Sequence, residues 1–105
     1  MNFLPIFHLR IETDVRKAVA YYEGPSPGLG ARFKRTFYAA VDSILVFPGK
    51  HAVKVGGEIR TRLLRPFPYL IFYAVGQDVV FVLMVQYAGQ RPALLKTIVQ
   101  ERRAT

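Results

Sequence analysis

Seven arginine and tyrosine side chains in the second half of the chain could bind a phosphate or stack on a base. These candidates for binding a target or a partner protein are Arg60, Arg62, Arg65, Tyr69, Tyr73, Tyr87 and Arg91. A guanidinium neutralises a phosphate and an aromatic ring stacks on a base, so the set is compatible with RNA binding. Tyrosine is also enriched at protein interfaces, which makes a partner protein an alternative. The same residues are also typical of solvated strands and rim packing, so composition alone does not decide their role.

Side chains for acid–base or metal chemistry are sparse. The two histidines, His8 and His51, have no Asp, Glu or Cys at ligand spacing. No nucleophile elbow surrounds Ser26 or Ser43, and the stretch GPSPGLG lacks the Lys-Ser/Thr pair of a phosphate-binding loop. We therefore assign no catalytic residue, no metal site and no cofactor, and the sequence favours a protein that is not an enzyme.

The composition is that of one small basic domain. The chain has 105 residues, which is enough for a single hydrophobic core, and we expect one domain over residues 1–105. Its net charge is +8, so it attracts nucleic acid, an anionic membrane or an acidic protein. It has no cysteine and no signal-peptide pattern at its start, and we expect a cytoplasmic protein.

Residues 68–88, PYLIFYAVGQDVVFVLMVQYA, are almost as long and apolar as a membrane span. Gly76, Gln77 and Asp78 lie near the centre of this stretch, and an Asp there costs about 2.5–3.5 kcal/mol on insertion scales. The flanks are rich in Tyr, Phe, Ile and Val, which favour strands, and Gly-Gln-Asp favours a turn. The stretch therefore predicts a β-hairpin in water rather than a membrane helix.

The periodicity of apolar residues predicts a strand, two helices and four antiparallel strands. Thr13 is the expected N-cap of the first helix, and Gly24 with Pro25 its end. Two adjacent glycines, Gly56 and Gly57, predict a tight turn between two strands. The expected elements are a strand over 6–12, helices over 13–24 and 30–47, strands on either side of the turn within 52–64, strands over 69–75 and 79–87, and a short terminal helix after Pro92.

Both faces of the expected hairpin strands are apolar, as in strands covered on both sides. Strict alternation gives the second strand one face with Val79, Phe81, Leu83, Val85 and Tyr87, and another with Val80, Val82 and Met84. Two helices cover only one face of such a sheet, so curling, the terminal helix or another chain must close the other. We expect the face of Tyr69 and Tyr73, shared with Arg60 and Arg62, to be the one that a partner covers.

Three segments together resemble a known family. DVRKAVAYYEGPSPGLGARF, IRTRLLRPFPYLIFYAV and VVFVLMVQYAGQRP are similar to the ParE/RelE superfamily of toxins from bacterial type II toxin–antitoxin systems, specifically its ParE-like (plasmid stabilization) branch. The resemblance runs from the first strand to Pro92. Its most specific features are the order and spacing of Tyr21-Tyr22, the PGLG at 27–30 and the RPFPY at 65–69.

The resemblance implies an α+β fold, in which a helical hairpin packs on a mainly antiparallel, twisted sheet in the order β-α-α-β-β-β-β. It also implies a cognate, ParD-like antitoxin protein that wraps and neutralises the toxin as a hetero-oligomer, without a membrane partner. ParE-like members are associated with blocking DNA gyrase, and RelE-like members cut messenger RNA on the ribosome.

Three positions bear on the choice between these two activities. The ribonuclease branch commonly has a catalytic arginine where this chain has Leu70, and an apolar side chain cannot stabilise a developing phosphate charge. Arg91 is the basic residue that could replace it. At Tyr87, ParE-like relatives often have a histidine. The resemblance therefore favours a gyrase inhibitor, with ribosome-dependent RNA cleavage as the alternative.

Overall fold

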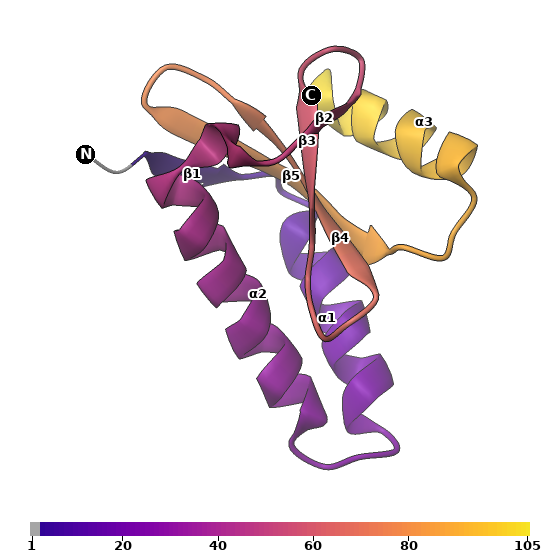
Figure 1. Cartoon of the computed structure of the whole chain (residues 1–105). Helices are drawn as coiled ribbons and strands as arrows, with labels where there is room; N and C mark the ends of the chain where they lie inside the picture. Colours follow the sequence, from indigo (N-terminus) through magenta and orange to yellow (C-terminus); the bar gives the residue numbers. More distant parts are fainter. Residues whose placement is uncertain (1–2) are drawn as a thin grey trace.

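The computed structural model describes residues 3–105. Its elements are β1 (Leu4–Phe7), α1 (Ile11–Glu23), α2 (Leu29–Val46), a single 3-10 turn η1 (Pro48–Lys50), β2 (Val53–Val55), β3 (Ile59–Leu63), β4 (Tyr69–Val75), β5 (Val79–Tyr87) and α3 (Pro92–Arg103). The predicted order, including the terminal helix, is confirmed. Figure 1 shows α1 and α2 as a hairpin on one side of the twisted sheet and α3 on the other.

The five strands form one mixed sheet in the order β1-β5-β4-β3-β2. β1 runs parallel to β5, and every other pair is antiparallel, so the predicted mainly antiparallel sheet is confirmed. The predicted hairpin at residues 68–88 is β4 and β5, with Asp78 in its turn at φ 60°. Gly56 and Gly57 have φ angles of 60° and 77°, as a primed turn requires. None of the helices in residues 3–105 has the length and apolarity needed to cross a bilayer.

The first strand and the first helix lie earlier than predicted. The strand ends at Phe7, and α1 begins at Ile11, two residues before the expected cap. His8 makes this turn, because its carbonyl accepts the Ile11 N–H at 3.0 Å and its Nδ1 accepts the Arg10 N–H at 3.1 Å. The alternation over 6–12 was misleading because Ile11 is buried as part of a helix rather than a strand.

The helical hairpin depends on a close approach between α1 and α2. A methyl group added at Gly30 would lie 2.7 Å from the Val19 carbonyl oxygen, so only glycine fits there. The Glu23 carboxylate accepts the N–H groups of Gly28 and Gly30 at 2.9–3.0 Å and thereby caps the start of α2. The PGLG segment therefore has a structural role in joining the two helices.

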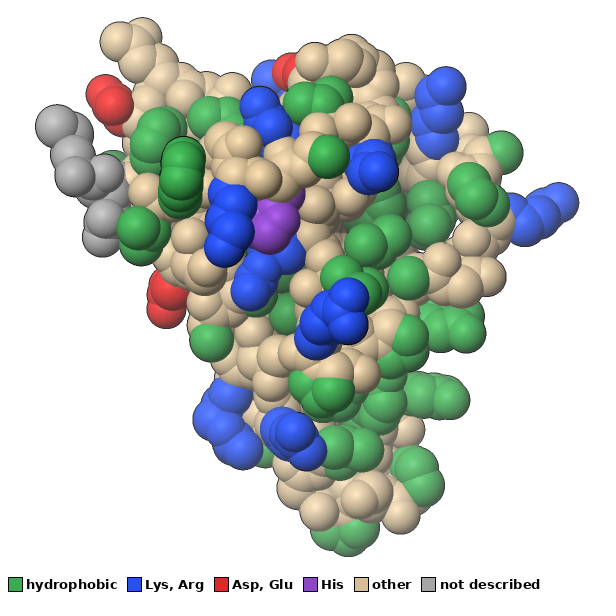
Figure 2. Space-filling model, viewed as in Figure 1, with side chains coloured by type: hydrophobic (Ala, Val, Ile, Leu, Met, Phe, Trp, Pro, Cys, Tyr) green, Lys and Arg blue, Asp and Glu red, His purple; other side chains and the backbone are tan. Residues whose placement is uncertain are grey.

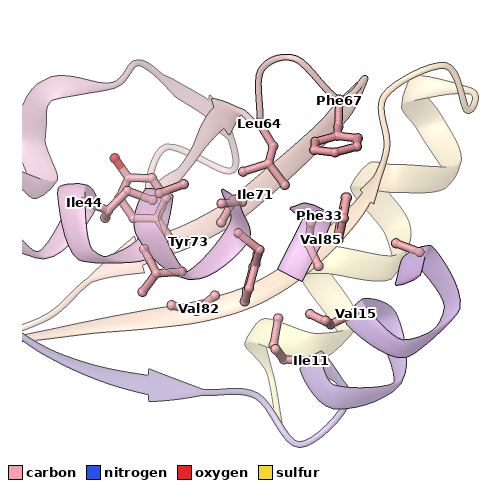
Figure 3. Packing of buried hydrophobic residues seen from close by; sticks show 14 of the residues in the cluster. Ile11, Val15, Phe33, Ile44, Leu64, Phe67, Ile71, Tyr73, Val82 and Val85 are labelled. Carbon is pink, nitrogen blue, oxygen red and sulfur yellow. The ribbon is translucent and has the colours of Figure 1, made fainter. Parts of the chain in front are cut away.

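The larger core lies between the helical hairpin and one face of the sheet. Figure 3 shows its side chains meeting from α1, α2, β4, β5 and the loop between β3 and β4: Ile11, Val15, Phe33, Ile44, Leu64, Phe67, Ile71, Tyr73, Val82 and Val85. Tyr73 is fully buried in this core. The prediction that the face of Tyr69 and Tyr73 is left for a partner is therefore wrong, because the chain's own helices cover that face.

A smaller core lies on the opposite face, under α3. Leu95 and Val99 of α3 pack there against Phe72 of β4 and against Leu83 and Met84 of β5. Strict alternation in β5 is also wrong: Phe72 pairs with Met84 and Tyr73 with Val82, so the extra residue Leu83 forms a bulge. Of the three alternatives for closing this face, the structure selects the terminal helix.

A buried ion pair fastens α3 to the rest of the molecule. The Arg102 guanidinium donates to the two oxygens of Asp14 on α1 at 2.5 and 2.9 Å. Asp14 also accepts the Val85 N–H at 3.0 Å and the Gln86 side-chain amide at 3.1 Å. One carboxylate thus holds α1, β5 and α3 together.

Candidate functional site

Two of the predicted arginines line a cavity between α2 and β3. The cavity has a volume of about 490 Å³ and is lined by Thr36, Ala39, Ala40, His51, Arg62, Leu63, Leu64 and Arg65. Arg62 and Arg65 belong to the predicted set, whereas Arg60, two positions before Arg62 on β3, is not among the lining residues. Figure 2 shows blue basic side chains gathered around a purple histidine on this side of the molecule.

Two further predicted residues fix the loop that carries His51. The Tyr73 hydroxyl donates to the Pro48 carbonyl at 2.8 Å, and burial raises the pKa of this phenol, so it stays a donor. The Arg60 guanidinium donates to the His51 carbonyl at 2.6 Å. Both residues therefore hold the loop at the rim of the cavity.

The charges in the cavity are all positive. Arg62 Nη1 is buried and has no hydrogen-bond partner among the described residues. Burial lowers the pKa of His51, and the nearby positive charges of Arg62 and Lys50 lower it further. No carboxylate lines the cavity, and the ion pairs found within residues 3–105 all lie elsewhere. An anion is the species that would satisfy such a site.

The two predicted tyrosines Tyr69 and Tyr87 lie apart from this cavity, in an aromatic cluster. Tyr69 packs against Phe33 at a ring-centroid distance of 5.0 Å and against Tyr87 at 6.1 Å. Phe67 and Tyr22 complete the cluster, 4.8 Å from each other. The YY and RPFPY motifs that carry the sequence resemblance thus meet in space. Tyr87 is exposed at the edge of the cluster.

The remaining predicted residue, Arg91, is exposed just before α3 and does not line any of the cavities described here. Nearby, a groove of about 460 Å³ runs between α3 and β4. Leu70 lines this groove among largely apolar neighbours, and Lys54 and Lys96 are its only charged lining residues. The described residues offer no acid–base pair in it, and no cluster of three metal-ligating side chains occurs within residues 3–105.

The edge of the sheet formed by β1 is a surface that the sequence reasoning missed. Leu4 and Leu9 are 68% and 80% exposed, and Ile6 and Phe7 are also exposed. β1 has β5 as its strand partner on one side and lies at the end of the sheet order on the other. Tyr38 of α2 packs on Phe7 at 6.2 Å and extends this apolar edge. The sequence signal for this surface was that residues 2–7, NFLPIF, contain no charged side chain.

Sequence spacing does not bring His51 near any other candidate residue. It has no ligand partner nearby in the chain, but the fold places it beside Arg62, eleven positions further along.

No family model matches the chain, and no curated protein matches it. A chain from a solved structure described as "Chromosomal ParDE TA system from P. aeruginosa" has a similar structure, with a TM-score of 0.71. The two chains are 12% identical, and the match covers 81% of this chain and 95% of the other. The protein therefore has a fold that also occurs in a ParDE toxin–antitoxin system, as the sequence resemblance implied.

Proposed function

We propose that this protein is the toxin of a type II toxin–antitoxin module and that a ParD-like antitoxin neutralises it. The similarity of fold to a chain of a ParDE system supports this proposal. The net charge of +8 suits an acidic partner, because opposite charge speeds encounter and favours the correct partner.

The apolar edge at β1 carries the proposal. An edge strand has backbone N–H and C=O groups that a second chain can pair with, and soluble proteins usually protect such edges with charge or a short length. Here the short strand β1 has exposed Leu4, Ile6 and Phe7 instead of charged side chains. An antitoxin segment that packs on this edge would cover these side chains, whereas pairing with the backbone is restricted because Pro5 has no N–H and the Phe3 N–H already donates to the Leu45 carbonyl.

DNA gyrase is the target we propose, in line with the ParE-like resemblance. The alternative is cleavage of messenger RNA on the ribosome. Leu70 argues against that alternative, because this apolar side chain stands where the ribonuclease branch commonly has an arginine and it cannot stabilise a developing phosphate charge. Both activities require the same fold, so only the cellular effect distinguishes them.

Expression with and without the neighbouring gene tests the proposal. We expect growth to stop when this chain is induced alone and to resume when the neighbouring gene is co-expressed. If plasmid DNA loses its negative supercoiling while transcripts stay intact, gyrase is the target. If transcripts are cut on ribosomes, the alternative holds. Normal growth on induction alone, with no binding to the neighbouring product, would refute the toxin assignment.

A pair of matched variants locates the antitoxin surface. Ile6→Asp places a charge on the β1 edge, and Val53→Asp places the same charge on the opposite edge strand, β2, where the side chain is also exposed. We expect Ile6→Asp to weaken antitoxin binding and Val53→Asp to leave it unchanged. Circular dichroism confirms that both variants are folded. Equal effects of the two variants would exclude β1 as the docking edge.

A further inference from the structure

We propose that the cavity between α2 and β3 binds the phosphate of a phosphomonoester, with Arg62 as its main ligand and Arg65 and His51 beside it. This inference does not depend on the chain being a toxin. It follows from the lining of the cavity, which contains Arg62, Arg65 and His51 and no carboxylate, while Arg62 Nη1 is buried without a hydrogen-bond partner among the described residues. Guanidinium groups at a cavity without a carboxylate favour an oxyanion as their partner.

Residues 3–105 do not supply that partner. Arg60, two residues before Arg62 on β3, donates to the carbonyls of Gly49 and His51, which are the nearby loop acceptors. The lining residues contain no Asp or Glu. Thr36 brings no charge, and its hydroxyl proton is donated to the Arg32 carbonyl at 2.8 Å. The lining residues therefore include no negatively charged acceptor.

The number of positive groups favours a phosphate over a carboxylate. One guanidinium already satisfies both oxygens of a carboxylate through a bidentate pair. A phosphomonoester has three terminal oxygens and a charge close to −2 at neutral pH, so it can bind Arg62 and Arg65 together and also accept from His51.

The cavity also has room for more than the phosphate. Its volume of about 490 Å³ lies within the range of small-molecule sites, roughly 300–1,000 Å³. Ala39, Ala40, Leu63 and Leu64 form its uncharged walls, which suit the organic part of an ester. A mononucleotide and the 5′ end of a phosphorylated nucleic acid share this chemistry.

Titration of the purified chain with inorganic phosphate, followed by NMR at constant ionic strength, tests the site. We expect saturable shifts centred on Arg62, Arg65 and His51. Arg62→Gln should weaken phosphate binding about ten- to a hundredfold, the range expected for a lost hydrogen bond to a charged group. Arg32→Gln is the matched control, because Arg32 is exposed on α2 outside the cavity and its loss changes the net charge equally.

Ala39→Phe provides a second test that removes no charge. Its ring would fill the cavity and should abolish phosphate binding even if Arg62→Gln fails to fold. An equal loss from Arg62→Gln and Arg32→Gln, binding that persists in Ala39→Phe, or acetate binding as tight as phosphate binding would each overturn the proposal.

Three further probes identify the source of the phosphate: adenosine monophosphate, 5′-phosphorylated trithymidylate and the unphosphorylated trinucleotide. Tighter binding of the phosphorylated trinucleotide than of the mononucleotide assigns the site to a nucleic acid end, and the reverse order assigns it to a free mononucleotide. Equal binding of the phosphorylated and unphosphorylated trinucleotides would exclude a phosphomonoester site.

Discussion

The buried pair between Asp14 and Arg102 gives the sharpest test of how the C-terminal helix is held. The Asp14 side chain is 4% exposed and that of Arg102 is 12% exposed. Asp14→Asn keeps the shape of the side chain and removes its charge. Its amide would then turn N–H donors toward Arg102, which is itself only a donor, and the bidentate pair would be lost.

The expected loss of stability follows from this burial. Removing one partner of a buried ion pair costs about 3–5 kcal/mol, because the other charge stays buried without compensation. The free energy of unfolding of a small domain is about 5–15 kcal/mol in total, so Asp14→Asn should remove a large share of it. With a urea m-value of about 1.5 kcal/mol/M, the unfolding midpoint should fall by about 2–3 M.

Urea unfolding at pH 7 measures this change, and Glu12→Gln is the matched control. Glu12 lies on the same helix and pairs with Arg16 at 2.8 Å, but the two side chains are 84% and 67% exposed. An exposed pair of this kind contributes about 0.3–0.5 kcal/mol. Native-state hydrogen exchange should show α3 opening first in Asp14→Asn, because α3 would lose the two bonds by which Arg102 holds it to α1 and would keep from Arg102 the bond to the Leu83 carbonyl.

Two outcomes would refute the reasoning. A loss below about 1 kcal/mol for Asp14→Asn would mean that the pair is not desolvated as its burial implies. Equal losses of stability in Asp14→Asn and Glu12→Gln would mean that burial does not make the Asp14–Arg102 pair contribute more than the exposed Glu12–Arg16 pair.

Two further predictions concern the helical hairpin and the histidines. Gly30→Ala should destabilise the protein by about 1–3 kcal/mol, because the added methyl group would overpack against Val19. Gly24→Ala is the control, since its added methyl group meets only ordinary van der Waals contacts and should not destabilise the protein. Thermal melts compare the two variants, and equal melting temperatures would contradict the close approach of α1 and α2. Burial lowers the pKa of both His8 and His51 below 6.5, with help from Arg102 and Arg10 at His8 and from Arg62 and Lys50 at His51. The unfolded chain therefore binds protons before the folded chain does as the pH falls through 6.5. The free energy of unfolding should decrease from pH 7.5 to 5.5, and it should decrease less in His51→Gln than in the unmodified protein. The same dependence of the free energy of unfolding on pH in both proteins would contradict this.

Most of the elements could be predicted because their signals are local. The apolar stripe on residues 30–47, the Gly56-Gly57 turn and the β4–β5 hairpin each depend on neighbours within a few positions. The start of α1 was missed because alternation in a short run also fits a turn followed by a helix, and only the hydrogen bonds of His8 decide between them.

The candidate site was predictable only in part. Spacing correctly placed Arg60 and Arg62 on one face of a strand, since side chains alternate along it. It did not reveal that this face lies under α2, with Arg62 at a cavity and Tyr73 inside the core. A periodic pattern says which residues share a face, but the packing of distant helices decides which face is covered.

The sequence by itself determined the element types, the basic charge and the two-sided apolarity of the central strands, because these depend on composition and short-range spacing. Tertiary structure decided that α3 closes the second face, that Leu83 forms a bulge and that Asp14 meets Arg102 across 88 positions. It also decided that β1 is left as an apolar edge and that Arg62 lines a cavity, with its Nη1 buried and without a hydrogen-bond partner within residues 3–105. Contacts between residues far apart in the chain are set by how the layers pack, and no local pattern encodes that arrangement directly.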